Sequence, residues 1–112
     1  MWFCAALLRV AERNGKRDAN SLWEEQFVLV ESVDEQQASK LVQERYGHDQ
    51  APYKNNKGDL IAWKFVAVER VYAIEQHTLN NGTEVFSRFL RDSEAQSLLT
   101  PFSEEATDRQ KR

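Results

Sequence analysis

Residues 60–74 read LIAWKFVAVERVYAI, which is the longest run of β-branched and aromatic residues in the chain. The run holds neither glycine nor proline, and it predicts one long β-strand, or two strands joined by a bulge near residues 67–69. Alternation at period two gives two sets, Trp63, Phe65, Ala67 and Val71 on one face and Val66, Val68, Tyr72 and Ile74 on the other. A strand that is apolar on both faces is normally covered on both faces.

The length and charge of the chain limit what kind of protein it is. At 112 residues it is expected to form one domain. Its net charge is −3 and its basic residues are scattered among acidic ones, so we expect no nucleic-acid binding. Cys4 is the only cysteine, which excludes an internal disulfide and favours a cytoplasmic location. The apolar start, residues 1–8, is too short to span a membrane and is predicted to be a strand.

The first third of the chain predicts a β-hairpin. Residues 2–13 and 22–31 are apolar runs joined by a polar loop, which favours two antiparallel strands. In the first strand, Trp2, Cys4, Ala6, Leu8 and Val10 share one face, and Phe3, Ala5, Leu7, Arg9 and Ala11 share the other. Arg9, Glu12 and Arg13 are expected to bring the end of this strand into water.

A helix is predicted over residues 33–46. Ser32 and Glu35 match the capping-box pattern, and Gly47 is expected to end the helix in a left-handed conformation. Residues 48–59 are polar and predict a connecting loop. The pair Asn81-Gly82 predicts a type I′ hairpin turn that leads into a last strand over residues 83–91. There Val85, Ser87 and Phe89 would face one way, and Glu84, Phe86, Arg88 and Leu90 the other.

These elements predict an α+β fold. It is a four-stranded antiparallel sheet in ββαββ order with one main helix packed on one face, either ferredoxin-like or dimeric α/β-barrel-like. Residues 1–91 would form the domain, residues 92–102 a short helical or irregular segment, and residues 103–112 a disordered tail. The second face of the sheet needs a cover as well, from residues 92–102, from a second copy or from a partner protein. Of these we favour a sheet-on-sheet homodimer.

The chain offers little for catalysis or cofactor binding. His48 and His77 have no other ligand type at metal-binding spacing, so no metal site is predicted. The four glycines stand apart from one another, so no phosphate-binding loop and no nucleotide cofactor are expected. Glu24 and Glu25 are adjacent on a strand, so they point to opposite faces and cannot act as a pair. We therefore predict no catalytic residue.

A looser group of side chains remains, in which aromatic rings stand beside amide, carboxylate, ammonium and guanidinium groups. Its members are Trp23, Glu25, Tyr53, Lys54, Asn55, Trp63, Glu84 and Arg88. Such residue types suit a small polar pocket or a protein-binding hot spot. The alternative is that the aromatic residues are core and that Arg88 forms a salt bridge with a glutamate at the rim of the sheet.

Several short motifs match a known family. They are MWF at residues 1–3, LWEE at 22–25, YKN at 53–55, Gly58, WKFV at 63–66, Val68 and NGTEVFSR at 81–88. Over about residues 1–91 the chain resembles the uncharacterised bacterial family Domain of Unknown Function 4288. The resemblance implies a bacterial, cytosolic, single-domain protein and no assigned activity.

The favoured function is therefore a non-enzymatic protein-interaction module that binds itself as a homodimer or binds another protein. An immunity or antitoxin-like protein is one form of such a module. The alternative is a small-ligand-binding or enzymatic dimeric α+β domain with a pocket between its sheets. In that case Tyr53, Glu84 and Arg88 would be the polar groups of the pocket.

Overall fold

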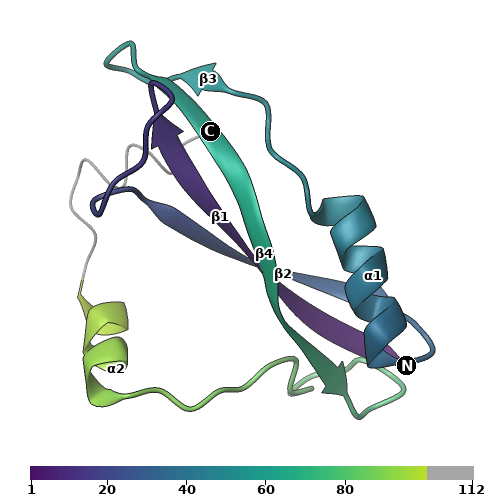
Figure 1. The fold of residues 1–112 in the computed structure, drawn as a ribbon. Helices are drawn as coiled ribbons and strands as arrows, with labels where there is room; N and C mark the ends of the chain where they lie inside the picture. Colours follow the sequence, from purple (N-terminus) through teal and green to yellow (C-terminus); the bar gives the residue numbers. More distant parts are fainter. Residues whose placement is uncertain (101–112) are drawn as a thin grey trace.

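The computed structural model describes residues 1–100 and shows an α+β fold (Figure 1). An open four-stranded antiparallel sheet has the strand order β2-β1-β4-β3. The elements are β1 (Trp2–Arg13), β2 (Trp23–Glu31), α1 (Glu35–Tyr46), β3 (Tyr53–Lys54), β4 (Leu60–Ile74) and α2 (Asp92–Leu99). The described part does not confirm the ferredoxin-like or barrel-like arrangement. The predicted disordered tail, residues 103–112, lies outside the described residues.

The central strand is β1, which pairs antiparallel with β2 on one side and with β4 on the other. Its two predicted faces are confirmed. Phe3, Ala5 and Leu7 are buried beneath α1, where Ala38 and Val42 complete the core. The opposite face carries Cys4 and Ala6, which are also buried. Both faces of β1 are therefore buried, which explains why both are largely apolar.

Two bulges break the alternation of β4. The first bulge is at Val66, since Arg9 pairs with Phe65 and Leu8 with Ala67. The second is at Glu69, since Leu7 pairs with Val68 and Ala6 with Arg70. Each extra residue moves the following side chains to the other face. Val68 therefore packs in the α1 core beside Phe65 and Val71, and Ala67 lies on the opposite face. The predicted bulge is confirmed, and the predicted faces of Ala67 and Val68 are wrong.

The caps of α1 differ in detail from the prediction. Asp34 rather than Ser32 is the N-cap, and its carboxylate accepts a hydrogen bond from the backbone N–H of Gln37 at 2.8 Å. Ser32 instead extends the sheet, because its N–H donates to the carbonyl of Met1 at 2.9 Å. Gly47 does end the helix, but its φ is −84° and not left-handed. A Cβ atom at this position would lie 2.7 Å from the carbonyl oxygen of Gln43, so close approach explains the glycine.

The predicted strand over residues 83–91 is wrong. The turn from Asn80 to Thr83 closes with a hydrogen bond from the Thr83 N–H to the Asn80 carbonyl at 3.1 Å, but only Gly82 in it has positive φ. That is the pattern of a type II turn, which does not match the twist of a hairpin as type I′ does. The fourth strand is instead β3, within the predicted loop, and it pairs with Leu60 and Ile61 of β4.

Arg9 is a charged residue buried in the sheet, so the expectation that it lies in water is wrong. It is only 3% exposed. Its guanidinium donates to the carbonyl oxygens of Tyr46 and His48 and to the Oε1 atom of Gln26, the last at 2.6 Å. The last carbonyls of a helix have no partner within it, and a cation suits the negative end of the helix dipole. Arg9 thus fastens the end of α1 to the sheet.

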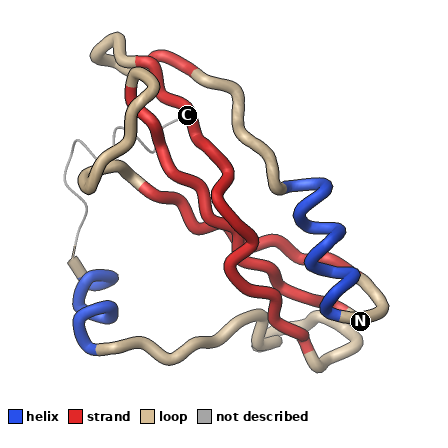
Figure 2. The backbone as a smooth tube through the Cα atoms, viewed as in Figure 1, coloured by secondary structure: helices blue, strands red, loops and turns tan. Residues whose placement is uncertain are grey.

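After β4 the chain leaves the sheet (Figures 1 and 2). Within residues 1–100, α2 makes no close contact with any strand or with α1. The radius of gyration is 16.2 Å, whereas a compact chain of this length has about 13 Å. The structure therefore consists of a packed sheet and helix, followed by a segment that ends in a separate helix, α2.

Candidate interaction surface

The face of the sheet opposite α1, here called the open face, carries exposed apolar side chains. Along β2, Trp23 is 47% exposed, Phe27 is 47% exposed and Leu29 is 42% exposed. They alternate with residues that turn toward α1, such as Val28 and Val30. The open face is thus apolar and only partly covered, in contrast to the α1 face.

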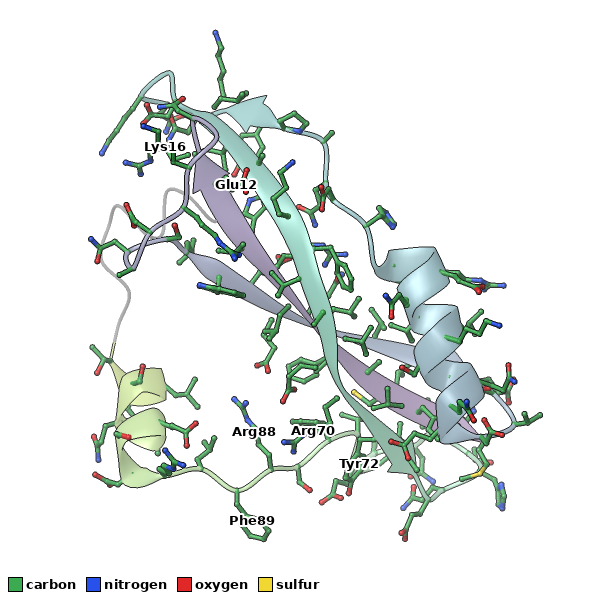
Figure 3. The ribbon with its side chains drawn as sticks, in the orientation of Figure 1. Glu12, Lys16, Arg70, Tyr72, Arg88 and Phe89 are labelled. Atoms are coloured by element: carbon green, nitrogen blue, oxygen red, sulfur yellow. The ribbon has the colours of Figure 1, made fainter. Side chains whose placement is uncertain are left out.

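Residues 84–88, here called the strap, cross part of the open face in an extended conformation. Every second side chain of the strap turns toward the sheet, as Figure 3 shows for Arg88. The ring of Phe86 lies 5.1 Å from that of Phe27 on β2 and 5.9 Å from that of Tyr72 on β4. The guanidinium of Arg70 lies 5.7 Å from the Phe86 ring. Phe86 is therefore held between both strands that flank β1.

Polar contacts hold the two ends of the strap. The hydroxyl of Tyr72 donates to the carboxylate of Glu84, and this bond raises the pKa of Tyr72. At the other end, Nη1 of Arg88 lies 3.6 Å from Oε2 of Glu25. The predicted alternation of this segment is confirmed for these residues, although the segment pairs with no strand within residues 1–100. Side-chain contacts replace the missing backbone ladder.

Small residues of β1 explain why an aromatic ring fits here. Ala6 pairs with Phe27 on one side and with Arg70 on the other. Cys4 pairs in the same way with Leu29 and Tyr72. The short side chains of Cys4 and Ala6 thus lie between longer ones of β2 and β4, which leaves room for the Phe86 ring above them. Burial in this sheet also raises the pKa of the Cys4 thiol, which makes it a poor nucleophile.

The chain beyond the strap exposes further apolar side chains. Phe89 is fully exposed and points away from the sheet (Figure 3). Leu98 and Leu99 of α2 are exposed as well. A lone exposed leucine needs no explanation, but several large apolar side chains on one extended segment are typical of an interaction site.

Four of the eight predicted site residues gather at the open face. Trp23 and Glu25 come from β2, and Glu84 and Arg88 come from the strap. The guanidinium of Arg17 lies 5.9 Å from the ring of Trp23. An aromatic side chain bordered by these charged groups has the composition of an interaction surface.

The other four lie away from the open face, on β3, on β4 and in the turn between them. The Asn55 side chain accepts hydrogen bonds from the N–H groups of Lys57 and Asp59, both at 3.0 Å, and so shapes the turn between β3 and β4. Lys54 is exposed on β3. Trp63 is buried and its indole N–H donates to the Tyr53 hydroxyl at 3.3 Å. The structure thus separates this cluster from the open face.

The family of the chain can now be stated. A family model described as "Domain of unknown function (DUF4288)" matches residues 2–87. The chain belongs to this family. The DUF4288 match includes most of the strap and ends before Phe89 and α2. No curated protein and no solved structure matches the chain.

Sequence reasoning missed three members of this DUF4288 surface, namely Phe27, Tyr72 and Phe86. For two of them the signal was present, because Phe27 stands at period two from Trp23, and Phe86 shares a predicted face with Arg88. The sequence does not show that the strap crosses the sheet, because a pattern of period two does not specify which segment a face packs against. Within residues 1–100, no cluster of three metal-ligating side chains and no membrane-spanning helix is found.

Proposed function

We propose that this DUF4288 domain is a non-enzymatic module that binds another protein through its open face, in the cytoplasm. One observation carries the proposal: Trp23, Phe27 and Leu29 are exposed on the same face of a single strand. Complete burial of a large apolar side chain contributes roughly 1.5–3 kcal/mol, so half-exposed ones have roughly 1 kcal/mol each left to gain. Phe89 has the full amount left to gain.

The charged groups of this surface favour a protein partner over a small ligand. Glu25 lies between Trp23 and Phe27 on the same face and forms an ion pair with Arg88, and Arg17 lies against Trp23. Exposed aromatic side chains next to charged pairs suit a protein interface better than a mostly apolar, concave ligand pocket. A toxic enzyme held inactive by this chain would be one such partner.

The position of the strap argues against a sheet-on-sheet homodimer and against a ligand pocket between two sheets. Two sheets that pack face to face lie about 10 Å apart. Where Phe86 sits on Phe27 and Tyr72, the strap occupies that space. A sheet-on-sheet homodimer, or a ligand pocket between two such sheets, would need the strap to leave. We therefore favour a partner that contacts the strap and the exposed part of β2 together.

The test is affinity capture of the tagged full chain from its host, followed by binding measurements with the partner that is recovered. Trp23→Ala and Phe89→Ala should each weaken binding at least tenfold, since aromatic hot-spot residues contribute about 2 kcal/mol or more. Val33→Ala is the matched control, because Val33 is 80% exposed but precedes α1. If Trp23→Ala binds the partner as tightly as Val33→Ala does, the open face has no role in binding.

A further inference from the structure

In the described part of the chain, the outer edge of β2 faces no other strand. In an antiparallel ladder, alternate residues direct their N–H and C=O groups toward the neighbouring strand. Ser32 donates to Met1 and Ala11 donates to Leu22, both at 2.9 Å, so the even-numbered residues of β2 are those that bond β1. The backbone groups of the odd-numbered residues therefore point outward. Within residues 1–100, β2 pairs with no other strand.

These odd-numbered residues also carry the open face. They are Trp23, Glu25, Phe27, Leu29 and Glu31. The same five positions thus combine outward backbone groups with exposed side chains. A regular strand edge of nine residues is a template on which another strand can pair.

The second edge of the sheet differs. Residues 60 and 61 of β4 are covered by β3, and Gln50 donates its N–H to the Trp63 carbonyl at 3.0 Å. The side chain of Asp49 accepts a hydrogen bond from the N–H of Phe65 at 2.8 Å. Beyond these contacts come the bulges at Val66 and Glu69. Bulges twist an edge and discourage pairing, whereas the β1–β2 register has no bulge.

We infer that β2 pairs antiparallel with β2 of a second copy, around a two-fold axis at Phe27. In this register Phe27 meets Phe27, Glu25 meets Leu29, and Trp23 meets Glu31. No two like charges are opposite each other. A shift that sets Phe27 opposite Leu29 would place Glu25 against Glu31, which is unfavourable. A shift the other way would leave Glu31 outside the ladder and shorten it.

The paired strands would form one continuous sheet across both copies. Residues directly opposite each other share a face, so the two open faces would lie on the same side. The apolar rows of the two copies, Trp23, Phe27 and Leu29, would then merge into one longer surface. The pairing uses the strand edge and leaves the straps in place. It therefore does not depend on the partner binding proposed above.

The test is the mass of the purified full chain by sedimentation equilibrium, with Leu29→Pro compared with Leu29→Ala. The wild-type chain should have twice the monomer mass of 13.1 kDa at micromolar concentration. Proline removes an outward N–H that the β1–β2 ladder does not use, and such a position tolerates proline. Leu29→Pro should weaken the dimer about 100-fold and Leu29→Ala less than tenfold. A monomeric wild type, or a dimer that Leu29→Pro leaves intact, would overturn the inference.

A charge test provides a second measurement if Leu29→Pro does not fold. Leu29 lies opposite Glu25 of the second copy, so Leu29→Lys should keep or strengthen the dimer and Leu29→Glu should weaken it. The double variant Glu25→Lys with Leu29→Glu should restore it. Equal dimer stability of Leu29→Lys and Leu29→Glu would refute this register. If affinity capture recovers no partner protein but the chain sediments as a dimer, the proposed partner binding is wrong and the β2 pairing still holds.

Discussion

Replacing Arg9 with alanine should destabilise the fold more than the loss of any surface charge. The guanidinium is buried and donates to the carbonyls of Tyr46 and His48 at the end of α1. It also donates to Gln26 and lies 3.8 Å from Oε1 of Glu24. Burial lowers the pKa of Arg9 from its ordinary value, although the guanidinium stays charged at neutral pH.

The expected loss follows from the groups left behind. A fully buried acceptor that loses its donor costs about 1–3 kcal/mol, and the part-buried carbonyls of Tyr46 and His48 both lose theirs. Removing one member of a buried charged network costs about 3–5 kcal/mol in comparable cases. We therefore expect Arg9→Ala to lower the free energy of unfolding by about 4 kcal/mol. This is a large share of the roughly 5–15 kcal/mol of a typical domain.

Urea unfolding, followed by circular dichroism, measures this loss. With a slope of about 2 kcal/mol per molar urea, the midpoint should fall by about 2 M. Arg13→Ala is the control on the same strand, because Arg13 is partly exposed and lies 3.7 Å from Asp59. Such a pair contributes less than about 1 kcal/mol. If both variants lose the same amount, Arg9 does not fasten α1 as described.

Three further variants test local features. Gly47→Ala should cost about 1–3 kcal/mol of unfolding free energy, because its Cβ would meet the Gln43 carbonyl oxygen at 2.7 Å, and an unchanged urea midpoint would contradict this. Asp34→Ala should lower the urea midpoint through a loss of about 0.5–2 kcal/mol, and no loss would mean that Asp34 is not the cap. The hydrogen bond to Glu84 raises the pKa of Tyr72 in the folded state. This hydrogen bond therefore stabilises the fold fully below pH 10, and the stabilisation disappears as the pH rises through the folded-state pKa of Tyr72. Tyr72→Phe should therefore show a smaller loss of stability than wild type as the pH rises above 10, and equal slopes would argue against the bond.

The sequence predicts those elements whose signal is local and long. Residues 2–13 and the stretch from Leu60 to Ile74 are long enough for composition and period to specify strands, and both are strands. β3 has only two residues, too few to show any period, and it forms because the turn at Asn55 brings it onto β4. Length therefore separates the strands that were predicted from the one that was missed.

The errors concern contacts between distant segments. Arg9 alternates correctly with Leu7 and Ala11, yet nothing near it in sequence shows that carbonyls of α1 will meet it. The strap has the alternation of a strand, but its partners are side chains of Phe27, Tyr72 and Glu25 rather than a backbone ladder. A local pattern fixes which side chains share a face and leaves open what that face meets.

The pairing of β1 with β4 also has a consequence for synthesis on the ribosome. Trp2 pairs with Ile74, so the central strand is completed only when β4 has been made. β2 ends at Glu31 and β4 at Ile74, and at about 5–20 residues per second the nascent hairpin waits roughly 2–9 seconds for its third strand. During that time the edge of β1 that later pairs with β4 is exposed and can pair with any extended chain nearby. Chaperones that shield nascent strands should therefore bind this protein between the emergence of β2 and that of β4.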